Sequence, residues 1–153
     1  MTDLIKSILI TLFFAILGIL IVGSSFDIWV SLITQPSYAV PIWTWKVATV
    51  AYYLLMCFIL FKLFKMTDEA IRKKLFIFIL LIMIINELWH ILIFAFPSAL
   101  YAFLGLCVYT YLVYYTFLYS LKNEKFIAKI IAPYLIWVVY SLFWFHAVWL
   151  LNG

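Results

Sequence analysis

The chain has 153 residues, of which 70% are hydrophobic and 10% are charged, whereas about a quarter of the residues in a soluble globular domain are charged. Aromatic residues make up 22% of the chain and the formal net charge is +4. These proportions exclude a soluble enzyme domain, a disordered chain and a disulfide scaffold, and they indicate an integral membrane protein. A spanning helix needs about 20 apolar residues, so the chain can hold roughly five spans and little else.

Five apolar segments follow one another along the chain, and their length and lack of period-two alternation predict helices rather than strands. The expected spans are residues 4–24, 44–64, 75–96, 98–121 and 128–151. No charge lies between Glu87 and Lys122, so we place a turn at Pro97, because the residue before a proline disfavours the helical region. The sequence therefore predicts an all-α fold, a single five-helix transmembrane bundle over residues 1–153.

The connection between the first two spans, residues 25–43, is too long for a tight turn. It contains Pro36 and Pro41 but is otherwise rich in Trp, Tyr and Ile. An apolar connection of this length should pack against the bundle rather than extend into water. We therefore expect it to form a lid over one end of the helices.

The basic residues are distributed unevenly between the two ends of the expected bundle. Nine lie on the side of the N-terminus and of the second and fourth loops, namely Lys6, Lys62, Lys65, Arg72, Lys73, Lys74, Lys122, Lys125 and Lys129, whereas Lys46 alone lies on the other side. The positive-inside rule then predicts that the N-terminus lies in the cytoplasm and the C-terminus outside, and we expect the membrane to be a bacterial cell membrane. The basic loops suit anionic membrane lipid, and they do not require a nucleic-acid partner.

Three polar residues, Asn86, Glu87 and His90, lie in the middle of the third span. Asn86 and His90 are four residues apart, and Glu87 and His90 are three apart, so all three can share one helix face. A carboxylate near the bilayer centre costs at least a few kcal/mol, so it normally faces the interior and has a partner. The alternatives are a structural hydrogen-bonded pair, a polar ligand contact, a proton site, and a metal site with His146. A single Glu-x-x-His motif is a weak metal signal, and we expect no metal.

The fifth span carries an aromatic stripe at helical spacing, formed by Tyr134, Trp137, Ser141, Trp144 and Val148. Trp and Tyr in mid-span indicate a flat pocket wall for a planar apolar ligand. Bundle packing and an interfacial aromatic belt are the alternative explanation.

Two weaker patterns occur in the fourth span. Tyrosines recur at Tyr111, Tyr115 and Tyr119, which is explained by hydrogen bonds between helices. Small residues at Ser98, Ala102 and Gly105 permit a close helix contact, and they suggest a possible homodimer face.

Three local motifs resemble the TspO/MBR family, which includes the tryptophan-rich sensory proteins and the mitochondrial translocator protein (the peripheral benzodiazepine receptor). The run from Gln35 to Pro41 resembles the first-loop Lys-Pro-Ser-Trp-x-Pro-Pro of the family. Asn86-x-x-Trp89, followed by Phe94, resembles its third span. Pro133-Tyr134-x-x-Trp137, with Asn152 at the end of the last helix, resembles its fifth span. The order and spacing fit, so the resemblance covers nearly the whole chain.

The resemblance implies a five-helix bundle, often dimeric, with a pocket beneath the first loop for porphyrins and haem-related tetrapyrroles, and in some members for sterols and benzodiazepine-type drugs. It implies a set of residues that line or close the pocket: Tyr38, Pro41, Tyr53, Asn86, Trp89, Tyr134 and Trp137. From the polar residues and the aromatic stripe we add Glu87, His90, Ser141 and Trp144. No cofactor is expected to be required, since porphyrin or haem would enter as the ligand.

The chain departs from the family pattern at several of these positions. The span-two tryptophan is Thr49 here, and a span-four aspartate is Gly105. The family's light-dependent breakdown of porphyrin is linked to the span-two and span-five tryptophans, and of this pair only Trp137 remains. Glu87 and His90 lie where the family usually has neutral residues, which points to a changed polar lining and a different ligand.

The function that we expect is binding of a planar apolar ligand, tetrapyrrole or sterol-like, in an aromatic pocket within the bundle. Binding would serve transport, sensing or regulation, and we do not expect an enzyme. Two alternatives belong to other classes: a proton-coupled small-molecule carrier that uses Glu87 as its relay, and a membrane enzyme with a Glu/His metal site.

Overall fold

The computed structural model describes residues 2–95 and 98–153, and the regular structure in these residues is helical throughout. The helices are α1 (Asp3–Val22), α2 (Ser25–Leu32), α3 (Ile42–Phe64), α4 (Glu69–Ala95), α5 (Ala99–Asn123) and α6 (Lys125–Asn152). Five of them, all except α2, are long and apolar enough to cross a membrane. The prediction of an all-α transmembrane bundle is confirmed, while the turn expected at Pro97 lies outside the described residues.

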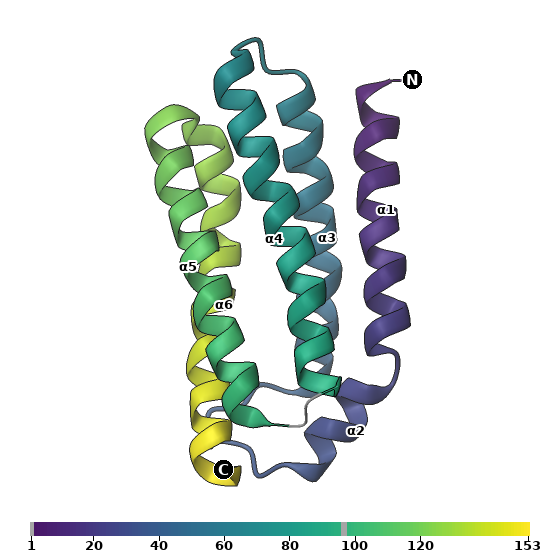
Figure 1. The fold of residues 1–153 in the computed structure, drawn as a ribbon, viewed down its shortest axis with the longest axis vertical. Helices are drawn as coiled ribbons and strands as arrows, with labels where there is room; N and C mark the ends of the chain where they lie inside the picture. The colour runs from purple at the N-terminus through teal and green to yellow at the C-terminus, as the bar shows by residue number, and fades with distance from the viewer. Residues whose placement is uncertain (1, 96–97) are drawn as a thin grey trace.

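The five long helices run along the long axis of the molecule (Figure 1). The N-terminus shares one end with the α3–α4 and α5–α6 connections, whereas α2 and the C-terminus lie at the other end. The middle of the bundle is formed by α3 and α4, which contact each other. On one side α1 packs against both, and on the other side α5 packs on α4 and α6 packs on α3 and α5. This arrangement leaves two interior regions, one on each side of α3 and α4.

The third long helix begins earlier than its apolar run. It starts at Glu69 rather than near Leu75, because the Asp68 carboxylate accepts a hydrogen bond from the backbone N–H of Ile71 at 3.0 Å. This side-chain bond satisfies a first-turn donor that has no partner within the helix. Glu69 then forms an i,i+4 ion pair with Lys73, with Nζ and Oε1 3.0 Å apart. Hydropathy alone detects the lipid-facing length, so it misses this charged first turn.

The connection between α1 and α3 contains a helix that was not predicted from the sequence. Gly23 adopts a φ of +47°, which an L side chain tolerates poorly, and this turn leads directly into α2. The rest of the connection is tied to α6: Thr34 N–H donates to Asn152 Oδ1 at 2.7 Å, and Asn152 Nδ2 donates back to the Thr34 carbonyl at 2.9 Å. Tyr38 Oη also donates to the Phe143 carbonyl at 2.9 Å. The segment from residue 33 to residue 41, here called the lid segment, therefore lies against α6.

The α5 tyrosines lie differently from expected, whereas the close helix contact of its small residues is present. Tyr111 is 69% exposed, while Tyr115 and Tyr119 each pack edge to face on Phe78 of α4, with ring centroids 5.5 Å apart, so ring contacts take the place of the expected hydrogen bonds. The small residues face α4 of the same chain: Ala102 is buried, and a Cβ added at Gly105 would lie 3.0 Å from Cδ1 of Trp89. Because Trp89 fills the space left by Gly105, the close contact that these small residues permit is made within one chain.

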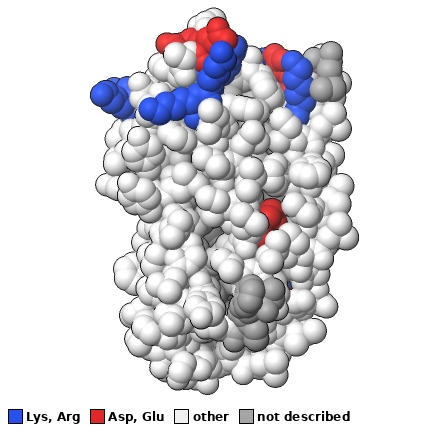
Figure 2. All heavy atoms as spheres, viewed as in Figure 1, with Lys and Arg blue, Asp and Glu red and all other residues white. Residues whose placement is uncertain are grey.

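Charge on the surface follows the pattern of a membrane-spanning molecule. Figure 2 shows that the charged side chains on this face gather at the end where the α3–α4 connection lies, apart from an acidic group near mid-length, and that most of the length is uncharged. Large apolar side chains such as Leu20, Leu54 and Ile136 are exposed along that length. Exposed apolar side chains over a helix bundle of this length suit an acyl-chain environment, and the protein is a multi-pass membrane protein.

Candidate functional site

A cavity of about 80 Å³ lies between α3, α4, α5 and α6. We call it the aromatic cavity. Six of the residues proposed from the sequence line it, namely Asn86, Trp89 and His90 from α4 and Tyr134, Trp137 and Ser141 from α6. The Trp89 indole is fixed by a hydrogen bond from Nε1 to the Ala102 carbonyl at 2.9 Å. Helices α4 and α6 thus turn their indole and polar groups toward a common interior space.

Five of the proposed residues do not line the aromatic cavity: Tyr53 and Glu87, which form the cluster described below, and Tyr38, Pro41 and Trp144. Trp144 is fully buried, with its ring centroid 5.0 Å from that of Trp45, because surrounding aromatic rings enclose it. Tyr38 is exposed, and its hydroxyl is used to hold the lid segment on α6. Pro41 precedes the first residue of α3 at the end of that segment. Tyr38, Pro41 and Trp144 support the end of the bundle rather than the cavity wall.

Helix α3 supplies a wall of the cavity that was missed from the sequence. Trp45, Thr49 and Tyr52 line the cavity, and they are spaced four and three residues apart on one face. The rings of Trp45 and Trp137 meet edge to face, with centroids 5.0 Å apart and an interplanar angle of 69°. Thr49 stands where the family has its span-two tryptophan. It lies one helical turn from Trp45, whose indole does contact Trp137.

The polar part of this cavity is formed by tyrosine hydroxyls. Tyr109 and Tyr134 are hydrogen-bonded to each other through their hydroxyl groups. Tyr52 is 4% exposed, and among residues 2–95 and 98–153 its hydroxyl has no partner within hydrogen-bond geometry. A buried hydroxyl without a partner has a free-energy cost, so a ligand group that bonds to it would gain stability.

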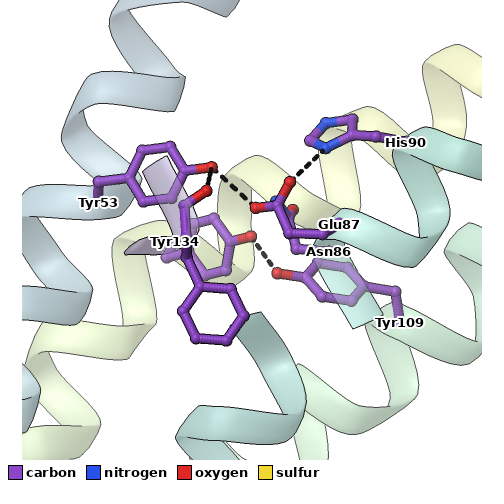
Figure 3. Close-up of polar contacts among 7 residues, drawn as sticks. Tyr53, Asn86, Glu87, His90, Tyr109 and Tyr134 are labelled. Atoms are coloured by element: carbon purple, nitrogen blue, oxygen red, sulfur yellow. Dashed lines mark hydrogen bonds and ion pairs between the residues drawn. The ribbon is translucent and has the colours of Figure 1, made fainter. Parts of the chain in front are cut away.

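A second polar cluster is built around Glu87, which is 2% exposed (Figure 3). Tyr53 Oη on α3 donates to Glu87 Oε1 at 2.8 Å, and Asn86 Nδ2 lies 3.3 Å from the same oxygen. His90 Nδ1 lies 3.5 Å from Glu87 Oε2. The shortest bond to the carboxylate thus comes from Tyr53 on α3 and not from His90 on its own helix.

His146 takes no part in this cluster. Its ring packs between those of Phe103 and Trp149, with centroids 5.1 Å and 5.9 Å away. Within residues 2–95 and 98–153, no three His, Cys, Asp or Glu side chains come close enough to hold a metal ion. The three-residue metal site considered from the sequence is therefore not assembled.

A larger cavity of about 300 Å³ lies on the other side of the α3–α4 pair, between α1, α2, α3 and α4. We call it the α1–α4 cavity. Tyr53 lines it, and four residues border both cavities: Trp45, Thr49, Trp89 and His90. The two spaces are thus neighbours separated by a wall of side chains from the middle helices.

Comparison with known proteins agrees with the helical arrangement. No curated protein matches the chain. The family model described as the TspO/MBR family matches residues 7–150, a range that covers all of α3, α4 and α5 and most of α1 and α6. The match covers nearly the whole chain, and this protein belongs to the TspO/MBR family.

Proposed function

We propose that the protein binds a planar apolar ligand, tetrapyrrole or sterol-like, in the aromatic cavity, and that binding serves transport, sensing or regulation. The observation that supports this most directly is the meeting of three indoles, Trp45, Trp89 and Trp137, around one interior space. A flat ligand would stack on these rings, and the free Tyr52 hydroxyl would orient one polar group of the ligand.

The energy available from such a site is sufficient for binding. Burying a few hundred Å² of ligand surface at about 25 cal/mol per Å² gives several kcal/mol, from which the cost of association is subtracted. Micromolar affinity corresponds to roughly 8 kcal/mol. Burial alone comes near this value only before the association cost is subtracted, so ring stacking and one or two polar contacts would have to offset that cost.

The size of the cavity implies that the ligand enters a widened form of it. A cavity of about 80 Å³ is smaller than the roughly 300 Å³ at which small-molecule pockets begin. The lid segment covers the neighbouring end of the bundle, and side-chain hydrogen bonds connect it to α6, including one from the backbone N–H of Val40 to Tyr140 Oη at 3.1 Å. We propose that the lid segment lifts when the ligand binds.

The test is fluorescence quenching by protoporphyrin in the detergent-solubilised full chain. Trp137→Ala removes an indole from the cavity wall, and we expect it to weaken quenching affinity about tenfold, the size of one aromatic contact. Trp43→Ala is the matched control, because Trp43 is an exposed indole on the same helix as Trp45. Equal affinities for wild type and Trp137→Ala would refute the proposed site.

We also propose an orientation for the protein in the bacterial cell membrane, with the N-terminus in the cytoplasm. The support is the nine-to-one distribution of basic residues between the two ends. In this orientation the lid segment faces outward, and a ligand arriving from outside would meet it first.

A further inference from the structure

We propose that the α1–α4 cavity is a second ligand site, and that it takes a lipophilic amine whose protonated nitrogen pairs with Glu87. The site lies apart from the proposed planar-ligand site, because its outer walls come from α1 and α2. Trp137 borders the aromatic cavity and is not among the residues that line the α1–α4 cavity.

The cavity has apolar sides and a polar inner end. Its sides include Ala15, Ile19 and Ile93, and Tyr53 and His90 are part of its lining. Both of these polar residues contact the Glu87 carboxylate. An apolar body with one polar group is the kind of ligand that this arrangement fits.

Glu87 is not itself among the residues that line the cavity, but its carboxylate lies next to three residues that do: Gly18, Tyr53 and His90. A Cβ at Gly18 would overlap the Tyr53 hydroxyl and lie 3.0 Å from Glu87 Oε2. The Tyr53 hydroxyl oxygen and Glu87 Oε2 therefore pack directly against the α1 backbone at Gly18, where there is no side chain. A side chain at Gly18 would cover them, and its absence leaves Oε2 beside the cavity.

In the part of the chain that the structure describes, Glu87 Oε2 has fewer close hydrogen-bond partners than Oε1. The two donors within 3.3 Å of the carboxylate, from Tyr53 and Asn86, both converge on Oε1. Oε2 faces His90 Nδ1 at 3.5 Å, which is long for a hydrogen bond. A carboxylate oxygen accepts about two hydrogen bonds, so a donor from a ligand has a place at Oε2.

The charge balance of the cavity favours a cation. In the described part of the chain, Glu87 forms no ion pair with Lys or Arg, and its one basic neighbour is His90, which carries a charge only when protonated. Lys46 also lines this cavity, but its Nζ lies 2.8 Å from Asp27 Oδ2, so these two charges compensate each other. An ammonium group would compensate Glu87, whereas a ligand carboxylate would be repelled.

Aromatic rings add a second reason for an amine. Phe26, Trp45 and Trp89 line the cavity, and the faces of such rings attract cations, most strongly those of tryptophan. The rings of Phe26 and Trp45 lie 5.6 Å apart. A two-ring aromatic amine fits a cavity of about 300 Å³ and uses both the rings and the carboxylate.

The experiment compares two probes of nearly equal shape, 1-naphthylmethylamine and the neutral 1-naphthalenemethanol. Binding to the full chain is measured by calorimetry near neutral pH in nanodiscs of uncharged phosphatidylcholine, with empty nanodiscs subtracted. We expect the amine to bind wild type roughly tenfold or more tightly than the alcohol, as one charged hydrogen bond provides. Glu87→Gln should reduce amine affinity to that of the alcohol and leave alcohol affinity unchanged.

Two further variants separate this site from a general effect of charge and from the aromatic cavity. Glu69→Gln removes an exposed carboxylate far from the cavity and should keep the full amine preference. Trp137→Ala should weaken protoporphyrin quenching as described above and keep the amine preference. The proposal is overturned if wild type binds the two probes equally, if the preference survives in Glu87→Gln, or if Trp137→Ala abolishes it. The first of these comparisons needs no variant, so it holds even where Glu87→Gln does not fold.

Discussion

Glycines at two positions show how strongly single residues shape this bundle. Gly105, which from the sequence was notable only as a missing aspartate, leaves room for the Trp89 ring, whose Cδ1 would lie 3.0 Å from a Cβ there. Gly18 similarly leaves room for the Tyr53 hydroxyl and the Glu87 carboxylate. A position that sequence comparison marks as a lost functional group can thus be a packing requirement.

The packing role of Gly18 leads to a prediction about stability. In an ordinary helix, Gly→Ala is stabilising by up to about 1 kcal/mol. Here the new Cβ would overlap the Tyr53 hydroxyl, so we expect Gly18→Ala to lower the free energy of unfolding by about 1 to 3 kcal/mol, the usual cost of overpacking. Thermal unfolding in detergent measures the effect.

A double-mutant cycle identifies the cause of that loss. Tyr53→Phe removes the hydroxyl that Gly18→Ala would displace, so the cost of Gly18→Ala should shrink in the Tyr53→Phe background. The same cost in both backgrounds would show that the hydroxyl does not set the packing limit at Gly18.

Among the helices, the sequence predicts best the positions of those that depend mainly on hydropathy. Hydropathy over about 20 residues suffices to locate the five long helices. It failed for α2, because this helix depends on tertiary packing: Trp29 stacks on Phe145, with ring centroids 5.7 Å apart and an interplanar angle of 16°. Such a contact joins residues far apart in the chain, and local patterns do not contain it.

The residues of the candidate site likewise divide into those that were recognisable in the sequence and those that were missed. The residues of α4 and α6 were recognisable because polar groups and tryptophans stand out against Leu and Ile. Trp45 and Tyr52 on α3 were missed, since aromatic residues occur on several faces of that helix and only the fold decides which face is interior. Tyr52 is buried, whereas Trp43 on the same helix is exposed.

The lid segment gives a prediction at this scale. Asn152 binds both backbone groups of Thr34 and also donates to the Val148 carbonyl at 2.8 Å. Asn152→Ala removes these bonds, and we expect amide hydrogen exchange in the lid segment to accelerate roughly tenfold, as expected for the loss of about 1.4 kcal/mol. Exchange in α4 should not change.

The matched control for that variant is Asn123→Ala. Asn123 donates from its side chain to the Tyr119 carbonyl at 2.7 Å, at the opposite end of the bundle. It should leave exchange in the lid segment at the wild-type rate. If Asn152→Ala also leaves that rate unchanged, other contacts of the segment with α6 hold it in place.

For the whole molecule, the pairing of α3 with α4 divides the interior into two spaces of different character. The aromatic cavity has tyrosine hydroxyls as its polar groups, whereas the α1–α4 cavity lies beside a buried carboxylate. Because Trp45, Thr49, Trp89 and His90 border both, a ligand that shifts this wall changes the other cavity too. Occupation of the two sites should therefore be thermodynamically coupled.

The distribution of charge predicts the orientation of the whole molecule, and this can be tested in living bacteria. Alkaline phosphatase, which is active only outside the cytoplasm, is fused after Gly153, and we expect it to be active because nine of the ten basic residues lie at the opposite end.

Replacing the basic cluster of the α3–α4 end with Gln leaves four basic residues there; the cluster is Lys62, Lys65, Arg72, Lys73 and Lys74. We expect phosphatase activity per molecule to fall, because part of the population inserts the other way round. Lys46→Gln removes the single opposing charge, so this control variant should keep the full phosphatase activity. An inactive fusion of the unaltered chain would reverse the assignment of the lid segment to the outer side, and with it the proposed direction of ligand entry.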